Sequence, residues 1–226
     1  MTNVNSLTLI IPAKHESESL PVFLKELKDL DYKILIVLQN DDYKTIKSLE
    51  EFDNIKLLYQ KNNGYGAALI EGLNSCETEY CCIINADGSM DPKYLNKMLE
   101  ECYNKDLIFG SRYMRGGGSE DDTIITFVGN KFFTFISNLL YNLNISDILY
   151  TYILGKTKSF RSLNLNYKDF RLCVEIPIKA KKNNMQYNCL PSFERSRIGG
   201  KKKVNIFKDG FLILFAIISF LFKKKY

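Results

Sequence analysis

Short apolar runs alternate with stretches of helical periodicity along the first half of the chain. The apolar runs occupy residues 7–11, 33–38, 55–59, 81–84 and 106–110. Helical patterns are expected over residues 17–30, 43–52, 67–76 and 93–103. Each apolar run is followed by glycine or polar residues. Strands that alternate with helices in this way indicate a parallel sheet. The pattern therefore predicts an α/β fold, with a mostly parallel sheet and helices on both of its faces. The residues after the strands should then gather at one edge of the sheet, which is the predicted site: Glu16, Gln39–Asp42, Asn62–Gly66, Asn85–Asp91 and Ser111–Arg112.

The texture of the sequence changes after residue 110. Gly116-Gly117-Gly118 and the polar residues 119–122 predict a mobile loop. The pattern then predicts helices over Thr126–Leu143 and Phe170–Lys182, a strand over Gln186–Leu190, and a basic loop over residues 193–203. We divide the chain into one domain, residues 1–205, and a C-terminal apolar helix within residues 206–226.

That C-terminal segment contains twelve residues, Phe211–Phe222, that are apolar except for Ser219. A bilayer-spanning helix needs about 20 apolar residues, so this run is too short to cross a membrane. Lys208 precedes it and Lys223–Lys225 follow it. Lysines beside an apolar helix favour contact with an anionic membrane interface. Contact with a partner or with a second copy of the chain is the alternative, and core packing is less favoured.

Composition narrows the class of protein. A length of 226 residues, with 46% hydrophobic and 25% charged residues, is ordinary for one globular domain. The net charge is +5, and basic runs in the last third favour a phosphate-rich partner. Nucleic acid is disfavoured as that partner because the lysines border apolar stretches and no ordered array of stacking aromatics accompanies them. Six cysteines without CxxC spacing and a single histidine argue against zinc. No signal peptide is visible, so we expect a cytoplasmic setting.

The stretch from Cys81 to Pro92 carries the strongest chemical signal. Its apolar run ends abruptly at Asn85, and Asp87 and Asp91 follow. Open α/β sheets bind ligands at the carboxyl ends of their strands, and Mg²⁺ is usually held there by one or two carboxylates plus substrate phosphates. We therefore predict that Asp87 and Asp91 hold a metal against a nucleotide diphosphate. The alternative is a strand end finished by turn-forming residues, in which Asp91 only caps the next helix.

Two common phosphate-binding motifs are excluded. The chain has no GxxxxGK[ST] sequence, so a P-loop is absent. Gly64-Tyr65-Gly66 follows the third apolar run, not the first, and lacks the last glycine of a dinucleotide-binding fingerprint.

Five motifs together resemble the family-two, GT-A-type glycosyltransferases. In chain order they are Ile10-Ile11-Pro12-Ala13-Lys14-His15-Glu16, Asn63-Gly64-Tyr65-Gly66-Ala67-Ala68 with Gly72, Asn85-Ala86-Asp87-Gly88, Gly110-Ser111-Arg112-Tyr113, and Gly116-Gly117-Gly118. The last two resemble the branch that transfers mannose or glucose to dolichyl or polyprenyl phosphate. Ser146-Asp147, the helix containing Glu175 and the 195–202 loop match that branch more loosely. The resemblance spans about residues 7–205.

The resemblance implies roles for individual residues. It implies a divalent ion, Mg²⁺ or Mn²⁺, at Asp87, with Ser89 or Asp91 nearby, and it makes Asp87 and Arg112 the residues central to catalysis. Nucleotide-sugar contacts fall on Pro12, Ala13, Glu16, Gln39, Asn63, Gly66, Asn85, Ala86 and Asp87. Contacts with an acceptor phosphate fall on Arg112, Arg195, Arg197 and Lys202.

Three positions depart from the family pattern. Asn85 stands where the family has the first aspartate of its metal motif, which removes a charge and should weaken metal binding. Gln39 stands where an aspartate near the base and ribose is usual. Residues Leu149–Tyr152 replace the family's GFR segment.

These observations predict an inverting enzyme of glycan biosynthesis. It would move a sugar from a UDP- or GDP-sugar to a polyprenyl phosphate at the cytoplasmic face of the cell membrane. A phosphomonoester is largely deprotonated at pH 7, since its second pKa is about 6, so this acceptor needs no general base. One alternative acceptor is a saccharide hydroxyl, with Asp91, Asp121 or Asp122 as the base. The other alternative is a non-catalytic nucleotide-sugar-binding or membrane scaffold protein.

Overall fold

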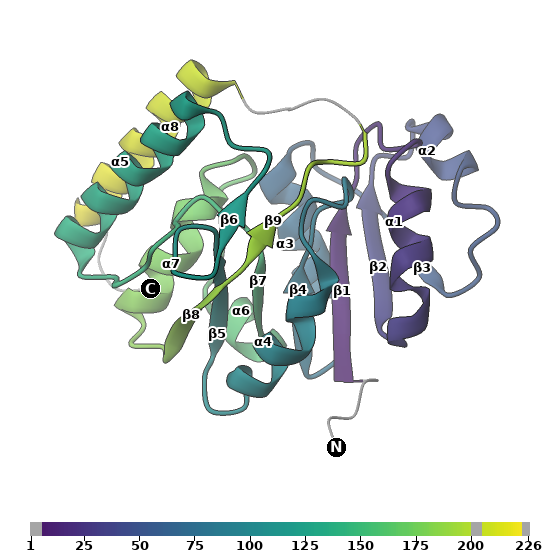
Figure 1. Ribbon diagram of the computed structural model, residues 1–226, viewed down its shortest axis with the longest axis horizontal. Helices are drawn as coiled ribbons and strands as arrows, with labels where there is room; N and C mark the ends of the chain where they lie inside the picture. Colours follow the sequence, from purple (N-terminus) through teal and green to yellow (C-terminus); the bar gives the residue numbers. More distant parts are fainter. Residues whose placement is uncertain (1–5, 200–204, 223–226) are drawn as a thin grey trace.

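A seven-stranded sheet forms the centre of the computed structural model, which describes residues 6–199 and 205–222 (Figure 1). The strands lie in the order β3-β2-β1-β4-β7-β5-β8. They are β1 Leu7–Pro12, β2 Lys33–Leu38, β3 Ile55–Tyr59, β4 Tyr80–Ile83, β5 Leu107–Ser111, β7 Ile153–Lys156 and β8 Tyr187–Pro191. All six predicted strands are present, and every pair among them in the sheet is parallel. The expectation of a mostly parallel sheet is confirmed.

Strand β7 is the exception, and the sequence reading did not predict it. It runs antiparallel between β4 and β5. Gly155 lies at its centre, where an added Cβ would be 2.4 Å from the side chain of Leu107. A glycine inside a short apolar run weakens the sequence pattern of a strand. The close packing requires this glycine, and the glycine in turn makes the strand hard to predict from the sequence.

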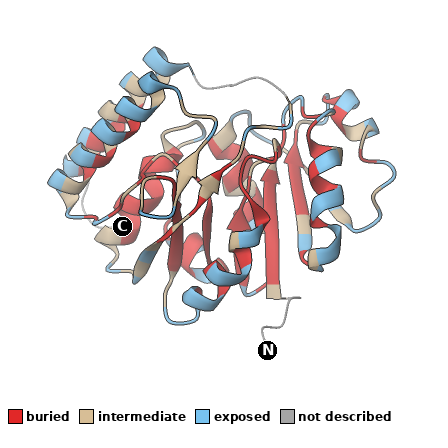
Figure 2. Cartoon of the chain, in the orientation of Figure 1, coloured by how far each residue is buried: buried red, intermediate tan, exposed pale blue. Residues whose placement is uncertain are grey.

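Helices cover both faces of the sheet, as predicted (Figures 1 and 2). Helices α1 (Leu20–Leu27) and α4 (Leu95–Cys102) contribute to one buried apolar core. Helices α3 (Tyr65–Ser75), α6 (Thr157–Ser162) and α7 (Leu172–Lys182) contribute to the other. Successive residues of β1 alternate between the cores: Leu9 and Ile11 belong to the first, and Ile10 to the second. The sheet is therefore buried on both sides, as its continuous apolar runs require.

Two predicted helices have a boundary that is wrong by three residues or more. The helix expected from Ser17 begins at Leu20, with a proline in its first turn, and continues to Leu30 through the 3₁₀ turn η2 (Lys28–Leu30). The helix expected to reach Phe52 ends at Lys47 as α2 (Tyr43–Lys47). After Lys47 the backbone hydrogen bonds join residues three apart, which produces a series of turns. A further 3₁₀ turn, η3 (Pro92–Tyr94), precedes α4.

The segment predicted as a mobile glycine loop is ordered. Strand β6 (Gly118–Ser119) pairs in parallel with β9 (Phe193–Glu194) in a small second sheet. Helix α5 follows over Ile124–Tyr141, two residues earlier at each end than predicted. Thr123 and Thr126 cap its start reciprocally, and Asn142, at φ +51°, ends it.

Helix α8 (Ile206–Phe222) packs against α5 and α7. Its buried residues, Ile213, Ala216, Ile217 and Phe220, belong to the second core. The C-terminal segment is therefore part of the folded domain over the residues described, and only its outer face is exposed (Figure 2).

Candidate active site

The residues predicted to meet at one edge of the sheet do so because the strands they follow are parallel. Residues 13–16, 39–42, 62–66 and 85–91 follow β1, β2, β3 and β4, and Ser111 and Arg112 lie at the end of β5. The antiparallel β7 starts at this same edge, so Thr151, two residues before the strand, joins the group. This edge of the sheet is the candidate active site.

Asp87 lies at this edge with its side chain 13% exposed. One carboxylate oxygen, Oδ1, accepts hydrogen bonds from the backbone N–H and the hydroxyl of Ser89, at 3.1 and 2.8 Å. The other, Oδ2, lies 3.6 Å from Nη1 of Arg197. Ser89 thus fixes the orientation of the carboxylate, and the second oxygen faces a cation.

Residues 195–198, which we call the arginine loop, cover the Asp87 segment. The backbone N–H of Arg195 donates to the carbonyl of Ser89 at 2.8 Å, and that of Ile198 donates to the carbonyl of Asp87 at 2.9 Å. Gly88 permits this approach. Its φ is +71°, and an added Cβ would be 2.4 Å from the Ile198 side chain.

Each arginine of the loop forms its own ion pairs. Arg195 contacts Glu26 through two bonds of 2.7 and 3.0 Å, and it also donates to the carbonyl of Gly88. Arg197 pairs with Asp121 at 2.8 Å besides facing Asp87. The structure therefore brings both predicted arginines to the site. Their contacts with an acceptor phosphate stay a prediction, and Lys202 lies outside the described residues.

Asn85 has a structural partner. Its side-chain oxygen accepts a hydrogen bond from the Tyr65 hydroxyl at 3.2 Å, and that hydroxyl is 2.7 Å from the Thr151 hydroxyl. Burial, together with the nearby Cys173 and Asp87, raises the pKa of Tyr65, so its hydroxyl stays protonated. Asn85 at the family's aspartate position is thus held by neutral partners. An aspartate here would place a second negative charge near Asp87.

The Asn63–Ala68 segment divides into two roles. Asn63 accepts a hydrogen bond from Gln39 at 2.6 Å, so two predicted nucleotide contacts meet at the exposed surface. Gly66 is buried under the loop at residues 167–169, where an added Cβ would be 2.3 Å from the carbonyl of Tyr167. The structure explains this glycine by close backbone packing, and it shows no exposed surface there for the predicted nucleotide contact.

The Pro12–Glu16 segment leaves β1 and is tied to the start of α2. Ala13 is buried, and Pro12 is half-buried. Glu16 is buried, and its carboxylate accepts a hydrogen bond from Ser19 at 2.6 Å. Asp42 accepts from the backbone of His15 at 2.6 Å. The predicted base contacts therefore lie on a rigid turn.

Arg112 lies at the centre of a buried carboxylate cluster. It contacts Asp147 through two bonds, of 2.7 and 3.0 Å, and Glu194 through one of 3.0 Å. Asp122 is 3.6 Å away, and the Tyr150 ring lies 4.6 Å from the guanidinium carbon. Burial disfavours the charged guanidinium, but the carboxylates of Asp147 and Glu194 outweigh that effect and raise the pKa of Arg112.

These contacts favour a different role for Arg112 from the one predicted. Its side chain is 8% exposed, and its donors are directed at carboxylates. It thereby joins β5 to β9 and to the segment before α5. The arrangement indicates a framework residue, so direct contact with an acceptor phosphate stays a prediction without support from the geometry. Sequence reasoning missed Glu194 because it is the one acidic residue within a basic loop.

Asp91 serves the helix that follows it. Its carboxylate accepts from the backbone N–H of Lys93 at 3.0 Å and pairs with the Lys93 ammonium at 2.8 Å. These contacts support the capping alternative. The metal-ligand role given to Asp91 gains nothing from them.

The residues at the edge fit a metal held partly by its substrate. Over the described part of the chain, no group of three or more His, Cys, Asp or Glu side chains is arranged to enclose a metal ion. Mg²⁺ commonly binds one carboxylate together with substrate phosphates, so Asp87 alone meets this requirement. The Ser89 hydroxyl and the Asn85 amide oxygen are neighbouring oxygen donors in the same loop.

Sequence comparison identifies the family. The family model described as "Glycosyl transferase family 2" matches residues 8–163, more than half of the chain. The chain belongs to glycosyl transferase family 2. Uncharacterized glycosyltransferases of Mycobacterium bovis and Mycobacterium tuberculosis are 32% identical to this family member over 111 residues. That match covers 48% of the chain and only 49% of the length of these relatives.

Solved structures support the GT-A fold for this family member. Glucosyl-3-phosphoglycerate synthase from Mycobacterium tuberculosis, in complex with Mn²⁺ and UDP-glucose, matches with a TM-score of 0.70 at 12% identity. The match covers 95% of this chain and 78% of the other. Mannosyl-3-phosphoglycerate synthase from Rubrobacter xylanophilus matches with a TM-score of 0.71 at 13% identity, over 96% and 74% of the two chains.

Proposed function

We propose that this protein transfers a sugar from a nucleotide-diphospho-sugar to a lipid phosphate at the cytoplasmic face of a membrane, with inversion at the sugar. The donor half of the proposal follows from family membership and from the position of Asp87 at the carboxyl end of β4. The lipid half rests on one observation, the exposed apolar face of α5 and α8.

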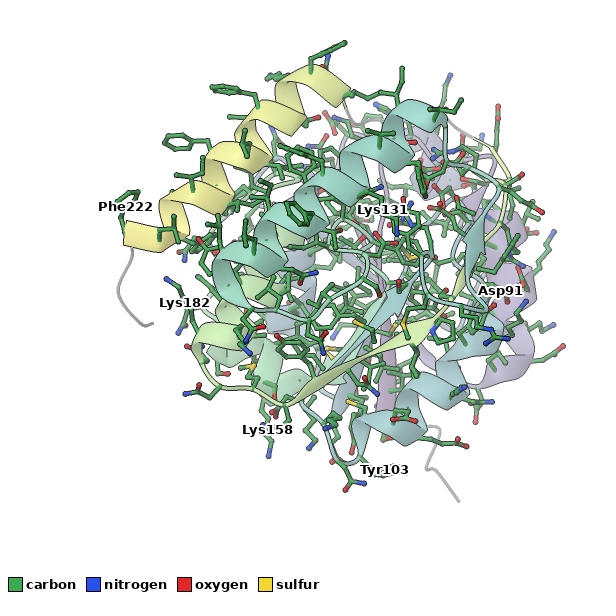
Figure 3. All side chains as sticks on the ribbon, turned by 60° about the vertical axis from the view of Figure 1, so that its left-hand side comes forward. Asp91, Tyr103, Lys131, Lys158, Lys182 and Phe222 are labelled. Carbon is green, nitrogen blue, oxygen red and sulfur yellow. The ribbon has the colours of Figure 1, made fainter. Side chains whose placement is uncertain are left out.

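That face is large and continuous. Among the described residues, eight exposed large apolar side chains lie on α5 and seven on α8, against five elsewhere. The two helices pack side by side, and many of their side chains project outward (Figure 3). Phe207, Phe211 and Phe222 are each at least 72% exposed. An apolar patch of this kind indicates an interaction surface.

The occupant we propose is the membrane interface. Over the described residues, α5 is long and apolar enough by length and composition to cross a membrane, and 17% of it is buried in the protein. Its central Lys131 and the packing of α8 on the core favour helices that lie in the interface plane. Lys208 lies on α8, and Lys182 donates to the carbonyl of Phe220 near its end. Cations beside the apolar face suit anionic lipid headgroups.

Lys131 also connects this face to the site. Its ammonium lies 4.5 Å from the centre of the Tyr113 ring, and Tyr113 follows Arg112. A lipid phosphate bound at the interface would lie close to this lysine. The isolated lysine within an apolar helix is the sequence signal for this residue, which the resemblance did not assign.

The carboxylates near the site disfavour a hydroxyl acceptor. Asp91 pairs with Lys93, Asp121 pairs with Arg197, and Asp122 accepts from the Tyr113 hydroxyl at 2.5 Å. Each candidate base is thus already engaged, and accepting a proton would weaken its ion pair or hydrogen bond. A lipid phosphate needs no base, because it is already ionised at pH 7.

In the proposed reaction Asp87 would hold Mg²⁺ or Mn²⁺, oriented by Ser89. The bound ion neutralises the negative charge that develops on the departing nucleoside diphosphate. Glu16 and Gln39 would contact the base and ribose. Arg197 would contact phosphate oxygens, since an arginine fork matches their geometry. Arg112 would hold β5, β9 and the start of α5 in place around this reaction.

A vesicle assay tests the lipid half. The double variant Phe211→Ser/Phe215→Ser should lose at least about tenfold in binding to anionic phospholipid vesicles, because burying one such side chain is worth about 1.5–3 kcal/mol. Val22→Ser/Tyr59→Ser, which alters exposed apolar residues elsewhere, should bind vesicles as the unaltered protein does. Equal binding by both variants, or dimerisation through this face in sedimentation equilibrium, would contradict membrane docking.

The acceptor is tested separately. Radiolabelled UDP- and GDP-sugars should be consumed with polyprenyl phosphate in vesicles and not with 3-phosphoglycerate or soluble saccharides. Transfer to a soluble acceptor alone would support the proposed nucleotide-sugar donor and contradict the proposed lipid acceptor. Failure to bind any nucleotide-sugar would favour the scaffold alternative.

A further inference from the structure

Arg197 lies against the carboxylate that the proposed function assigns to the metal. Its Nη1 is 3.6 Å from Oδ2 of Asp87, and the other oxygen, Oδ1, accepts two hydrogen bonds from Ser89. A divalent ion and a guanidinium repel each other, so they cannot share Oδ2 at close range. The Arg197 guanidinium therefore lies at the Asp87 oxygen that does not bind Ser89.

A second set of contacts holds the Arg197 guanidinium in place. Nη2 of Arg197 is 2.8 Å from Asp121, and Nε is 3.3 Å from the same carboxylate. The neighbouring Ser196 donates to Glu120 through its backbone N–H at 3.0 Å. Both carboxylates lie in the short segment between β6 and α5. The arginine loop is therefore attached at two points, and Arg197 stays anchored at Asp121 if Asp87 changes partner.

The exposure of this pair separates it from the framework ion pairs. The Arg197 side chain is 25% exposed and that of Asp87 is 13% exposed, whereas Arg112 is 8% and Asp147 0% exposed. A partly exposed pair at 3.6 Å exchanges more readily than a buried pair with two short bonds, because water compensates its separated charges. Arg197 can therefore leave Asp87 without disrupting the core.

We propose that Arg197 is a positioning residue that occupies the metal-facing oxygen of Asp87 in the empty enzyme and turns to the diphosphate when the metal–nucleotide complex binds. This inference rests on the metal role proposed for Asp87. Before binding, Arg197 faces the carboxylates of Asp87 and Asp121; after binding, the metal would take its place at Asp87 and the diphosphate would give Arg197 an anionic partner in exchange. A metal ion that binds alone has to displace the Arg197 guanidinium from Asp87. A metal ion that binds with its nucleotide brings a diphosphate, which replaces Asp87 as a partner of Arg197.

This exchange predicts opposite effects of one substitution. Arg197→Gln removes the competing cation, so the dissociation constant for Mn²⁺ alone should fall by about three- to tenfold. The same variant lacks a phosphate contact, so the dissociation constant for UDP or GDP with saturating Mn²⁺ should rise by about tenfold, as expected for loss of a charged hydrogen bond. Paramagnetic resonance of free Mn²⁺ and calorimetry measure the two constants. Arg197→Lys, which keeps the charge, should lie between the variant and the unaltered protein.

Arg171→Gln is the matched control. Arg171 pairs with Asp169 at 2.6 Å at the start of α7, and its side chain is 26% exposed, close to the 25% of Arg197. It should change neither constant. Unchanged or weaker Mn²⁺ binding in Arg197→Gln, including no measurable binding in that variant, overturns the inference. So does a change of both constants in the same direction.

Asp87→Asn separates this inference from the proposed function. If it binds Mn²⁺ as well as the unaltered protein does, the metal role of Asp87 is wrong, and the inference falls with it. If it loses Mn²⁺ while Arg197→Gln behaves like the control, only the inference is wrong. Neither titration requires an acceptor, so both results are independent of whether the acceptor is a lipid.

Discussion

Two arginines at the same edge of the sheet each contact at least two carboxylates, but one arginine is more deeply buried than the other. Arg112 is 8% exposed and contacts Asp147 through two short bonds, with Glu194 as a further partner. Arg197 is 25% exposed and divides its contacts between Asp121 and Asp87. Removing one partner of a buried pair leaves an uncompensated charge in a low dielectric, whereas water replaces much of a lost partner at the surface. Loss of Arg112 should therefore disrupt the fold more than loss of Arg197, and the Arg197 pairs can separate at the lower cost.

The comparison also reassigns chemistry between the two. The family resemblance placed both arginines at the acceptor phosphate. In the structure, Arg112 pairs with buried carboxylates and Arg197 faces Asp87. Neither Arg112, in a recognised motif, nor Arg197, in a loosely matching loop, has the surroundings that the resemblance suggests.

Arg112→Met gives the sharpest test of the buried cluster. It should lower the free energy of unfolding by about 3–5 kcal/mol, because Asp147 and Glu194 lose their buried partner. Arg197→Met should cost about 1 kcal/mol or less, since that pair is partly exposed. Urea denaturation followed by circular dichroism measures both. Equal losses would remove the distinction between framework and exchangeable pairs.

Asp87→Asn tests the exchangeable cluster by activity. Transfer should fall at least about a hundredfold, close to 3 kcal/mol in activation free energy, because the proposed metal loses its charged ligand. The urea midpoint should stay near that of the unaltered protein. Asp53→Asn, an exposed carboxylate before β3, is the control and should keep full activity. Full turnover by Asp87→Asn would exclude the metal role.

Gly88→Ala tests whether the arginine loop needs the tight turn beneath it. An alanine at φ +71°, 2.4 Å from the Ile198 side chain, should destabilise the protein by about 1–3 kcal/mol. Gly129→Ala, in α5 with no atom within 4 Å of the added Cβ, should be neutral or stabilising. Thermal unfolding compares the two. A neutral Gly88→Ala would show that the loop moves away at little cost.

Asp42 has a carboxylate held by hydrogen bonds, and substituting it should have the smallest effect on stability. Burial raises its pKa, but hydrogen bonds from His15 and Thr45 outweigh this and lower the pKa below the usual 3.8. Because the folded-state pKa is depressed, the stability it contributes is present above 3.8 and is lost as pH falls through the folded-state pKa. Asp42→Asn should therefore show a shallower loss of stability below pH 3.8, by about 1 kcal/mol or less. Identical acid unfolding curves would show that these hydrogen bonds contribute nothing.

Much of the fold could be predicted from the sequence. Continuous apolar runs such as Leu7–Ile11 identify strands buried on both faces, and the polar residues after each run identify the edge that carries the site. Asp87 was predictable on this basis, since it lies in the loop that leaves a buried strand. Strand β7 was not, because Gly155 interrupts its apolar pattern and its antiparallel direction depends on its neighbours.

Contacts between distant segments account for what the sequence left open. Glu194 lies 82 residues beyond Arg112, and Arg197 reaches Asp87 only because β9 pairs with β6 and Met90 bridges Glu194. An apolar pattern likewise predicts that α5 and α8 are helices. Which of their faces stays uncovered depends on how they pack against each other and on α7.

The sequence by itself determined the six parallel strands of the main sheet, most helices and the placement of Asp87, since periodicity and strand-end position are local properties of the chain. Only the tertiary structure decided which arginine is buried, which one faces Asp87 and which apolar residues remain exposed. Burial and pairing depend on the residues that other segments bring alongside, and the same guanidinium is a framework element or an exchangeable ligand according to how much water reaches it.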